Sequence, residues 1–299
     1  MNKLTKIKVA VTGGSGHIGH RVVDQLIERG HSVINIDKRP PVKPSPAKFV
    51  YVDTKRREQV QPVLAKVDAV IHLGEIPGVN NTYSEDELLI NNTMAGATMF
   101  QAACDLKLQR MVYISTAQVY GCWGTNCTTP VSGTMDETHP LRARNTYALS
   151  KINNEAYGKY IADRYGLSVA TLRFPAVHNW FKQRLDEACD WVKQQTGPIP
   201  EGWHTYVDAD DAAHACVLLL ENPRPEYQAY HCMADDINSG IPLAERIEKF
   251  SPEYPRLPKD WPPYKCPVLT DKLREHVGWK PTFNLIEEYR KKFGKYPHE

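Results

Sequence analysis

The feature that most restricts the fold of this chain is a regular alternation of two kinds of segment between residues 7 and 173. Short runs rich in β-branched residues occur at 7–12, 32–37, 48–52, 69–73, 110–115 and 168–173. Between them, segments at 17–28, 56–64, 85–105 and 147–165 carry apolar residues every three or four positions, which predicts helices. Strands that alternate with helices are typical of βαβ units, so we expect an α/β fold with a doubly wound, Rossmann-like parallel sheet.

The alternation fades after residue 173, which indicates a second part of the chain. Helices are expected at 180–195 and 210–220, and a strand at 229–233 could complete the sheet. Six prolines in 251–267 predict an extended connector there. We therefore expect a dinucleotide-binding domain over residues 1–175, its sheet completed by part of 205–235, and a small mixed substrate-binding lobe formed by 176–204 and 236–299.

Composition excludes several classes of protein. With 41% hydrophobic residues, 24% charged residues and a net charge of +2, the chain has the balance of a globular protein and no basic excess for nucleic acid. It has no apolar run near the roughly 18 residues of a membrane span and no signal-peptide pattern. Seven scattered cysteines suit a reducing compartment, so we expect a cytoplasmic protein. Cys122 and Cys127 lack a second ligand pair, and no metal site is expected.

A glycine cluster follows the first expected strand. Gly13, Gly16 and Gly19, with His17 and Ile18 among them, lie between an apolar run and a segment of helical period. Glycines let the backbone turn sharply and approach a pyrophosphate, and a helix N-terminus offers free N–H groups and partial positive charge. In this strand–turn–helix context the cluster predicts a dinucleotide site.

The second strand ends at Asp37, about 20 residues after the glycines. A carboxylate there can accept hydrogen bonds from ribose hydroxyls and would repel a 2′-phosphate, which favours NAD. Lys38 and Arg39 could instead hold such a phosphate, so NADP stays open as the less favoured cofactor. Asp53 and Thr54, after the third strand, are expected near the adenine.

Tyr147 and Lys151 are four residues apart, so they lie on one face of an expected helix. A nearby ammonium favours the phenolate and should lower the tyrosine pKa from about 10 toward working pH. Such a tyrosine can transfer protons.

The order of these motifs resembles that of the extended short-chain dehydrogenase/reductases, the NAD-dependent epimerase/dehydratase group. Further landmarks agree, namely Val112 to Gly121, His72-Leu73-Gly74, Asn92 before Ala102-Ala103, Leu172-Arg173-Phe174, Asp211-Ala212-Ala213 and Val277 to Pro281.

The resemblance implies a role for particular residues. It implies that Thr116 is the active-site hydroxyl, Tyr147 the acid/base, Lys151 the ribose-binding lysine and Asn92 the structural asparagine, with Ser115 beside them. It also implies a homodimer formed through the helices that begin near Asn92 and Tyr147. Further contacts to the cofactor are expected from Leu73, Gly74, Ser115 and Phe174.

Departures from the family pattern narrow the reaction. Ala117-Gln118 replace the Asp-Glu that follows the threonine in 4,6-dehydratases, which makes that reaction improbable. Ala176 and His204 stand where 4-epimerases of UDP-sugars carry an asparagine and an arginine. The absence of both weakens the case for a nucleotide diphosphate. Substrate contacts are expected from Glu75, Thr116, Ala117, Gln118, Ala176 and His204.

The segment Leu73 to Ile76 and the short C-terminal lobe look more like family members that oxidise free sugars. We therefore predict an NAD-dependent dehydrogenase/reductase that acts on a sugar or sugar acid. A UDP-hexose 4-epimerase with tightly bound NAD is the alternative, and an NAD-binding sensor without turnover is a lesser one.

Overall fold

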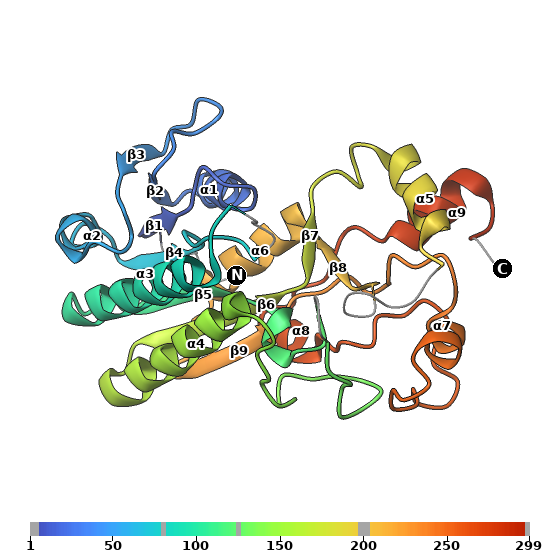
Figure 1. Ribbon diagram of the computed structural model, residues 1–299. Coiled ribbons are helices and arrows are strands. Elements are labelled where there is room, and N and C mark those ends of the chain that lie inside the picture. Colours follow the sequence, from blue (N-terminus) through green and yellow to red (C-terminus); the bar gives the residue numbers. More distant parts are fainter. Residues whose placement is uncertain (1–5, 79–81, 124–126, 197–203, 297–299) are drawn as a thin grey trace. The chain divides into compact units, whose positions relative to one another are not determined.

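The computed structural model describes residues 6–78, 82–123, 127–196 and 204–296 (Figure 1). Contacts divide the chain into two compact units. Unit 1 takes its described residues from 1–116, 145–173 and 213–230, and unit 2 from 117–144, 174–212 and 231–299. This division differs from the expected one in the segment 117–144, which clusters with the C-terminal segments.

A seven-stranded sheet forms the centre of unit 1, and its last two strands end at the boundary with unit 2. Its order is β3 (Lys48–Tyr51), β2 (Ser32–Asp37), β1 (Lys8–Thr12), β4 (Ala69–His72), β5 (Arg110–Thr116), β6 (Ser168–Phe174) and β9 (Tyr227–His231). The pairs β3–β2, β2–β1, β1–β4 and β4–β5 are parallel. The order runs outward in both directions from β1 and β4, so the doubly wound sheet is confirmed.

Helices α1 (Gly19–Glu28), α2 (Arg57–Leu64), α3 (Glu85–Asp105) and α4 (Thr146–Tyr165) connect these strands. Helix α3 begins at a capping box formed by Ser84 and Glu87, and Asn145 caps α4, which ends at Gly166 in the left-handed region. These local signals place both helix ends close to where the sequence predicts them.

The core of unit 1 follows the alternation of side chains along buried strands. Ala10, Val70 and Tyr113 point to the face of the sheet covered by α2, α3 and α4, and they pack there in one apolar cluster. Helix α1 instead contacts β1 and β2. Helices α3 and α4 lie side by side (Figure 1). A Cβ on Gly96 would come within 2.2 Å of the Asn154 amide, so this close approach requires glycine.

Unit 2 contains the two-stranded parallel sheet β7 (Ala176–His178) with β8 (Tyr206–Asp208), and helices α5 (Leu185–Gln194), α7 (Leu243–Phe250), α8 (Asp271–Val277) and α9 (Leu285–Phe293). Helix α6 (Ala209–Glu221) begins in unit 2 and continues into unit 1. The proline-rich stretch 251–267 contains no helix or strand longer than an isolated bridge, as expected.

The sequence placed the helix of unit 2 too early, because α5 starts at Leu185 and not near residue 180. Trp180 and Phe181 instead pack in an aromatic cluster with Trp191. None of the described helices is both long enough and apolar enough to cross a membrane.

Candidate active site

Several of the predicted site residues of unit 1 lie where its central parallel strands end. The carboxyl ends of β1, β2, β4 and β5 carry Gly13, Asp37, Leu73 and Thr116. In a doubly wound sheet this edge, at the change of strand order, is where ligands bind.

The glycine loop between β1 and α1 is shaped by backbone contacts. Gly13 has φ +67°, and a Cβ there would lie 2.9 Å from the carbonyl of Leu73. A Cβ on Gly19 would lie 2.0 Å from the Gly13 oxygen. Helix α1 starts after Ile18 with no side-chain cap and no acidic residue in its first turn. Its first N–H groups and partial positive charge therefore suit a pyrophosphate, so the loop fits a dinucleotide.

Asp37 lies beside this loop. Its carboxylate accepts hydrogen bonds from the backbone N–H of Ser15 at 3.1 Å and of Arg39 at 3.0 Å. Lys38 pairs with Asp53, Nζ to Oδ2 2.9 Å. Since Lys38 already has a carboxylate partner and Asp37 presents negative charge beside the loop, the local electrostatics favour NAD over a 2′-phosphorylated cofactor.

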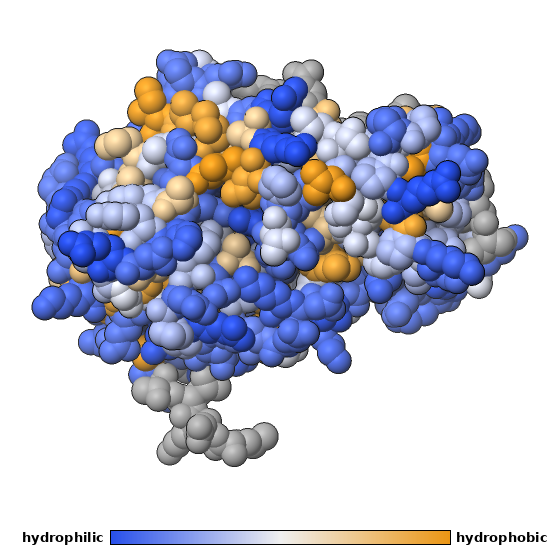
Figure 2. All heavy atoms as spheres, turned by 90° about the horizontal axis from the view of Figure 1, so that it is seen from below, coloured by the Kyte–Doolittle hydropathy of each residue, from blue (hydrophilic) through white to orange (hydrophobic). Residues whose placement is uncertain are grey.

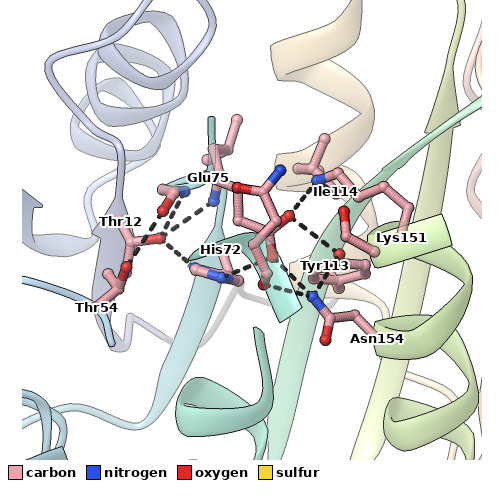
Figure 3. Close-up of polar contacts among 12 residues, drawn as sticks. Thr12, Thr54, His72, Glu75, Tyr113, Ile114, Lys151 and Asn154 are labelled. Atoms are coloured by element: carbon pink, nitrogen blue, oxygen red, sulfur yellow. Dashed lines mark hydrogen bonds and ion pairs between the residues drawn. The ribbon is translucent and has the colours of Figure 1, made fainter. Parts of the chain in front are cut away.

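Thr12, at the end of β1, holds the loop that follows β4 in place through hydrogen bonds. Its hydroxyl oxygen accepts hydrogen bonds from the N–H of Leu73 at 3.2 Å and of Gly74 at 3.1 Å, and lies 2.6 Å from His72 Nδ1. The Thr54 hydroxyl donates to the Gly74 carbonyl at 3.2 Å (Figure 3). Thr54, Leu73 and Gly74, all expected at the cofactor, are thus brought together.

Ser115 and Thr116 point to different partners, as neighbours on a strand should. The Ser115 hydroxyl donates to Glu155 Oε1 at 2.5 Å, in the interior. Glu155 also pairs with Arg173, whose Nη2 lies 2.6 Å from Oε2. Thr116 makes a side-chain hydrogen bond with Tyr147. This geometry places Thr116, and not Ser115, beside the predicted acid/base.

Tyr147 and Lys151 occupy one face of α4, and the Lys151 Nζ lies 5.5 Å from the centre of the Tyr147 ring. The expected lowering of the tyrosine pKa was wrong. Burial raises the pKa of Tyr147, the Lys151 charge lowers it, and the Glu75 carboxylate raises it again, so the net pKa lies above the ordinary value. The prediction from sequence considered only the charge of Lys151 and neither burial nor Glu75.

Asn92 acts on the backbone of the loop after β4. It is fully buried, its Oδ1 accepts from the N–H of Ile76 at 2.8 Å, and its Nδ2 donates to the Ile76 carbonyl at 2.9 Å. Its backbone carbonyl accepts from Asn154 Nδ2 at 2.9 Å. A structural role for Asn92, as the resemblance implies, agrees with these bonds.

The remaining predicted residues belong to unit 2. Ala117 and Gln118 form a 3₁₀ turn with Val119 and Tyr120, Phe174 is buried, and Ala176 is exposed at the start of β7. His204 is buried with φ +56°, and burial together with the charge of Arg246 lowers its pKa to about 4. It is therefore neutral at pH 7.

Among the described residues, no cluster of His, Cys, Asp and Glu could hold a metal ion.

Sequence reasoning missed part of the site. Gly78 packs against Tyr147 so closely that a Cβ would lie 2.4 Å from ring atom Cδ1. His72, Tyr113 and Asn154 surround Glu75 in the interior. The sequence did contain signals for three of these residues. His72 and Tyr113 are polar residues within the apolar strands β4 and β5, and Asn154 follows Lys151 by one helical turn.

Known proteins resemble the chain over most of its length. It is 26% identical to the UDP-glucose 4-epimerase of Streptococcus mutans, over 94% of this chain and 93% of that one. It is 28% identical to an L-arabinose 1-dehydrogenase (NAD(P)(+)) of Haloferax volcanii, over 56% and 65%. A short-chain dehydrogenase/reductase superfamily structure from Agrobacterium tumefaciens with bound NAD shares the fold, with a TM-score of 0.71, 18% identity and 95% of each chain covered.

A family model described as the NAD dependent epimerase/dehydratase family matches residues 9–186, more than half of the chain. The family match agrees with the strand order, the glycine loop and the Thr116–Tyr147–Lys151 arrangement. The chain therefore belongs to the NAD dependent epimerase/dehydratase family and is an NAD-dependent enzyme.

Proposed function

We propose that the chain is a dehydrogenase/reductase that transfers hydride between NAD and a sugar-type hydroxyl or carbonyl. The observation that carries this proposal is the placement of Thr116, Tyr147 and Lys151 at the carboxyl edge of the sheet, beside a glycine loop that fits a dinucleotide. The residues that we propose for proton transfer and for cofactor binding therefore lie in one part of unit 1.

The hydrogen bond between Thr116 and Tyr147 supports their roles, and the role of Lys151 toward the cofactor is the one that the family resemblance implies. Tyr147 takes the proton of the substrate hydroxyl in oxidation and returns it to the carbonyl oxygen in reduction. Thr116, bonded to Tyr147, donates a hydrogen bond to the same oxygen. Lys151 holds the nicotinamide ribose and supplies positive charge near the phenol. When bound, NAD would accept the hydride that leaves the carbon bearing this hydroxyl, and NADH would return it in the reduction.

We prefer a dehydrogenase/reductase over a UDP-sugar epimerase because of two residues in unit 2 that depart from the epimerase pattern. Ala176 has no donor, and His204 is uncharged at neutral pH. A diphosphate normally recruits charged or forked donors, and neither position offers one. A sugar or sugar acid without a nucleotide is consistent with these side chains.

A UDP-hexose 4-epimerase is the second candidate, and the relatives favour it. The Streptococcus mutans protein, similar over nearly the whole chain, is named a UDP-glucose 4-epimerase. In that reaction the same tyrosine and threonine would serve, but NAD would be regenerated in every turnover.

One experiment separates the two. The purified chain is first analysed by mass spectrometry for retained nucleotide, then incubated with NAD and a panel of sugars, aldonates, uronates and UDP-sugars while NADH absorbance is followed. The proposal predicts NADH formation with a free sugar or sugar acid. Interconversion of UDP-glucose and UDP-galactose without NADH would establish the epimerase instead.

We also propose a homodimer formed through α3 and α4. Several large apolar side chains on these two helices are exposed, namely Ile90, Met94, Leu149, Tyr160 and Tyr165. Figure 2 shows hydrophobic residues gathered on part of one face, among polar ones. Burial of such a surface stabilises association. Sedimentation at micromolar concentration tests this, and a monomer there would contradict it.

A further inference from the structure

Glu75 occupies an unusual place for a carboxylate. Its side chain is 3% exposed, and it lies in the loop after β4, in the interior of unit 1. An ionised carboxylate is costly to bury unless it is paired and hydrogen-bonded. The groups that pair with the Glu75 carboxylate therefore indicate its role.

Those partners come from three elements and surround both carboxylate oxygens (Figure 3). Oε2 lies 2.5 Å from Lys151 Nζ on α4 and accepts from the Tyr113 hydroxyl on β5 at 3.2 Å. Oε1 accepts from Asn154 Nδ2 on α4 at 3.1 Å and lies 3.3 Å from His72 Nε2 on β4. The histidine contact has ion-pair length without good hydrogen-bond geometry.

Lys151 is equally enclosed. Its side chain is 5% exposed, and its Nζ also donates to the Ile114 carbonyl at 2.7 Å. Glu75 is the one carboxylate in an ion pair with it among the described residues. Glu155, the other carboxylate whose charge acts on Lys151, makes its own pair with Arg173. The ammonium that faces Tyr147 is therefore half of a buried, net neutral pair.

From this geometry we propose that Glu75 is a positioning residue, the counter-ion that holds Lys151 in place and limits how strongly its charge favours the phenolate of Tyr147. This inference deepens the proposed function and rests on it for the role of Tyr147. It replaces the expected contact of Glu75 with substrate, since its oxygens face interior donors.

The charges around this group agree with the proposal. Burial would raise the pKa of Glu75, but Lys151 and His72 outweigh it and hold the carboxyl ionised. Burial would lower the pKa of Lys151, yet Glu75 and Tyr147 keep it above its ordinary value. The groups that act on Tyr147 are Lys151 from α4, Glu75 from the loop after β4 and the Thr116 hydroxyl from β5, and Tyr113 from β5 interacts with it as well.

Glu75→Gln tests the proposal, because it keeps the shape of the side chain and removes its charge. The full chain is labelled with ¹³C at the phenolic carbon of tyrosine and titrated by NMR, and the Tyr147 signal is identified by its loss in Tyr147→Phe. We expect its midpoint to fall by about one pH unit or more in Glu75→Gln, because the Lys151 charge beside the Tyr147 ring is then no longer compensated. An unchanged or higher midpoint in the folded variant overturns the proposal.

Glu221→Gln is the matched control. Glu221 is also a buried carboxylate of unit 1, and its partners are Arg29 and His31, which take no part in the site. Its removal should leave the Tyr147 midpoint where it is in the wild type, and an equal fall in this variant overturns the proposal.

Glu75→Asp covers the case in which the glutamine variant does not fold. It keeps the charge but draws it back from Lys151, so the midpoint should fall by less than in Glu75→Gln, and no fall overturns the proposal. Because the titration needs neither substrate nor turnover, it can fail while the proposed reaction holds, and the reaction can fail while the titration succeeds.

Discussion

Replacing Ser115 and Thr116 by alanine, one at a time, should separate stability from turnover. The Ser115 hydroxyl donates to the buried carboxylate of Glu155 at 2.5 Å. A hydrogen bond to a charged group contributes about 1.5–3 kcal/mol, so Ser115→Ala should lower the free energy of unfolding by that amount. Thr116 bonds Tyr147 at the reacting end of the site, and Thr116→Ala should lower turnover about 10- to 1,000-fold, as expected for a lost oxyanion-type donor.

Denaturant titration measures the first effect, and the rate of NADH formation on the substrate found in the screen measures the second. Thr116→Ser should keep much of the activity because the hydroxyl remains. Ser115→Ala should keep most of its turnover under conditions in which it is folded. Full turnover in Thr116→Ala together with its loss in a stable Ser115→Ala would refute the assignment.

Three further changes test other parts of the structure. Asp37→Ala should weaken NAD binding about tenfold or more in calorimetry, since a carboxylate bonded to ribose hydroxyls is lost, and unchanged affinity would count against its role. Burial raises the pKa of Asp236 from 3.8 to about 7 even though Tyr206 donates to it, so the folded state binds the extra proton. Stability should therefore fall by about 4 kcal/mol as pH rises from 4 to 8, and Asp236→Asn should remove most of that slope in denaturant titrations. Gly78→Ala should displace the Tyr147 ring and lower turnover at least about tenfold without unfolding the chain, as circular dichroism can confirm.

The sheet could be predicted because its signals are local. β-Branched runs, helical periodicity and caps such as Asn145 act within a few residues, and they located the described strands and helices of the first 173 residues closely. The glycine loop was predictable for the same reason. Short elements such as β7 and β8 were not predicted, because strands of three residues have no periodicity to detect.

The residues of the candidate site could be predicted from the sequence, but the electrostatic effects that set the pKa of Tyr147 could not. The spacing of Tyr147 and Lys151 is local, and Thr116 follows from the resemblance. The effect of Glu75 depends on a contact between residues 75 and 151, which lie in different elements, and the burial that raises the Tyr147 pKa depends on packing. Neither can be inferred from spacing along the chain.

Net hydride transfer is tested by counting the NADH formed per molecule of the chain when NAD is in excess over a free sugar-type substrate. We expect many NADH molecules per chain, and almost none from Tyr147→Phe, which should still bind NAD because its ring remains in place. If no sugar, aldonate or uronate yields NADH while UDP-glucose and UDP-galactose interconvert, net hydride transfer to NAD is contradicted.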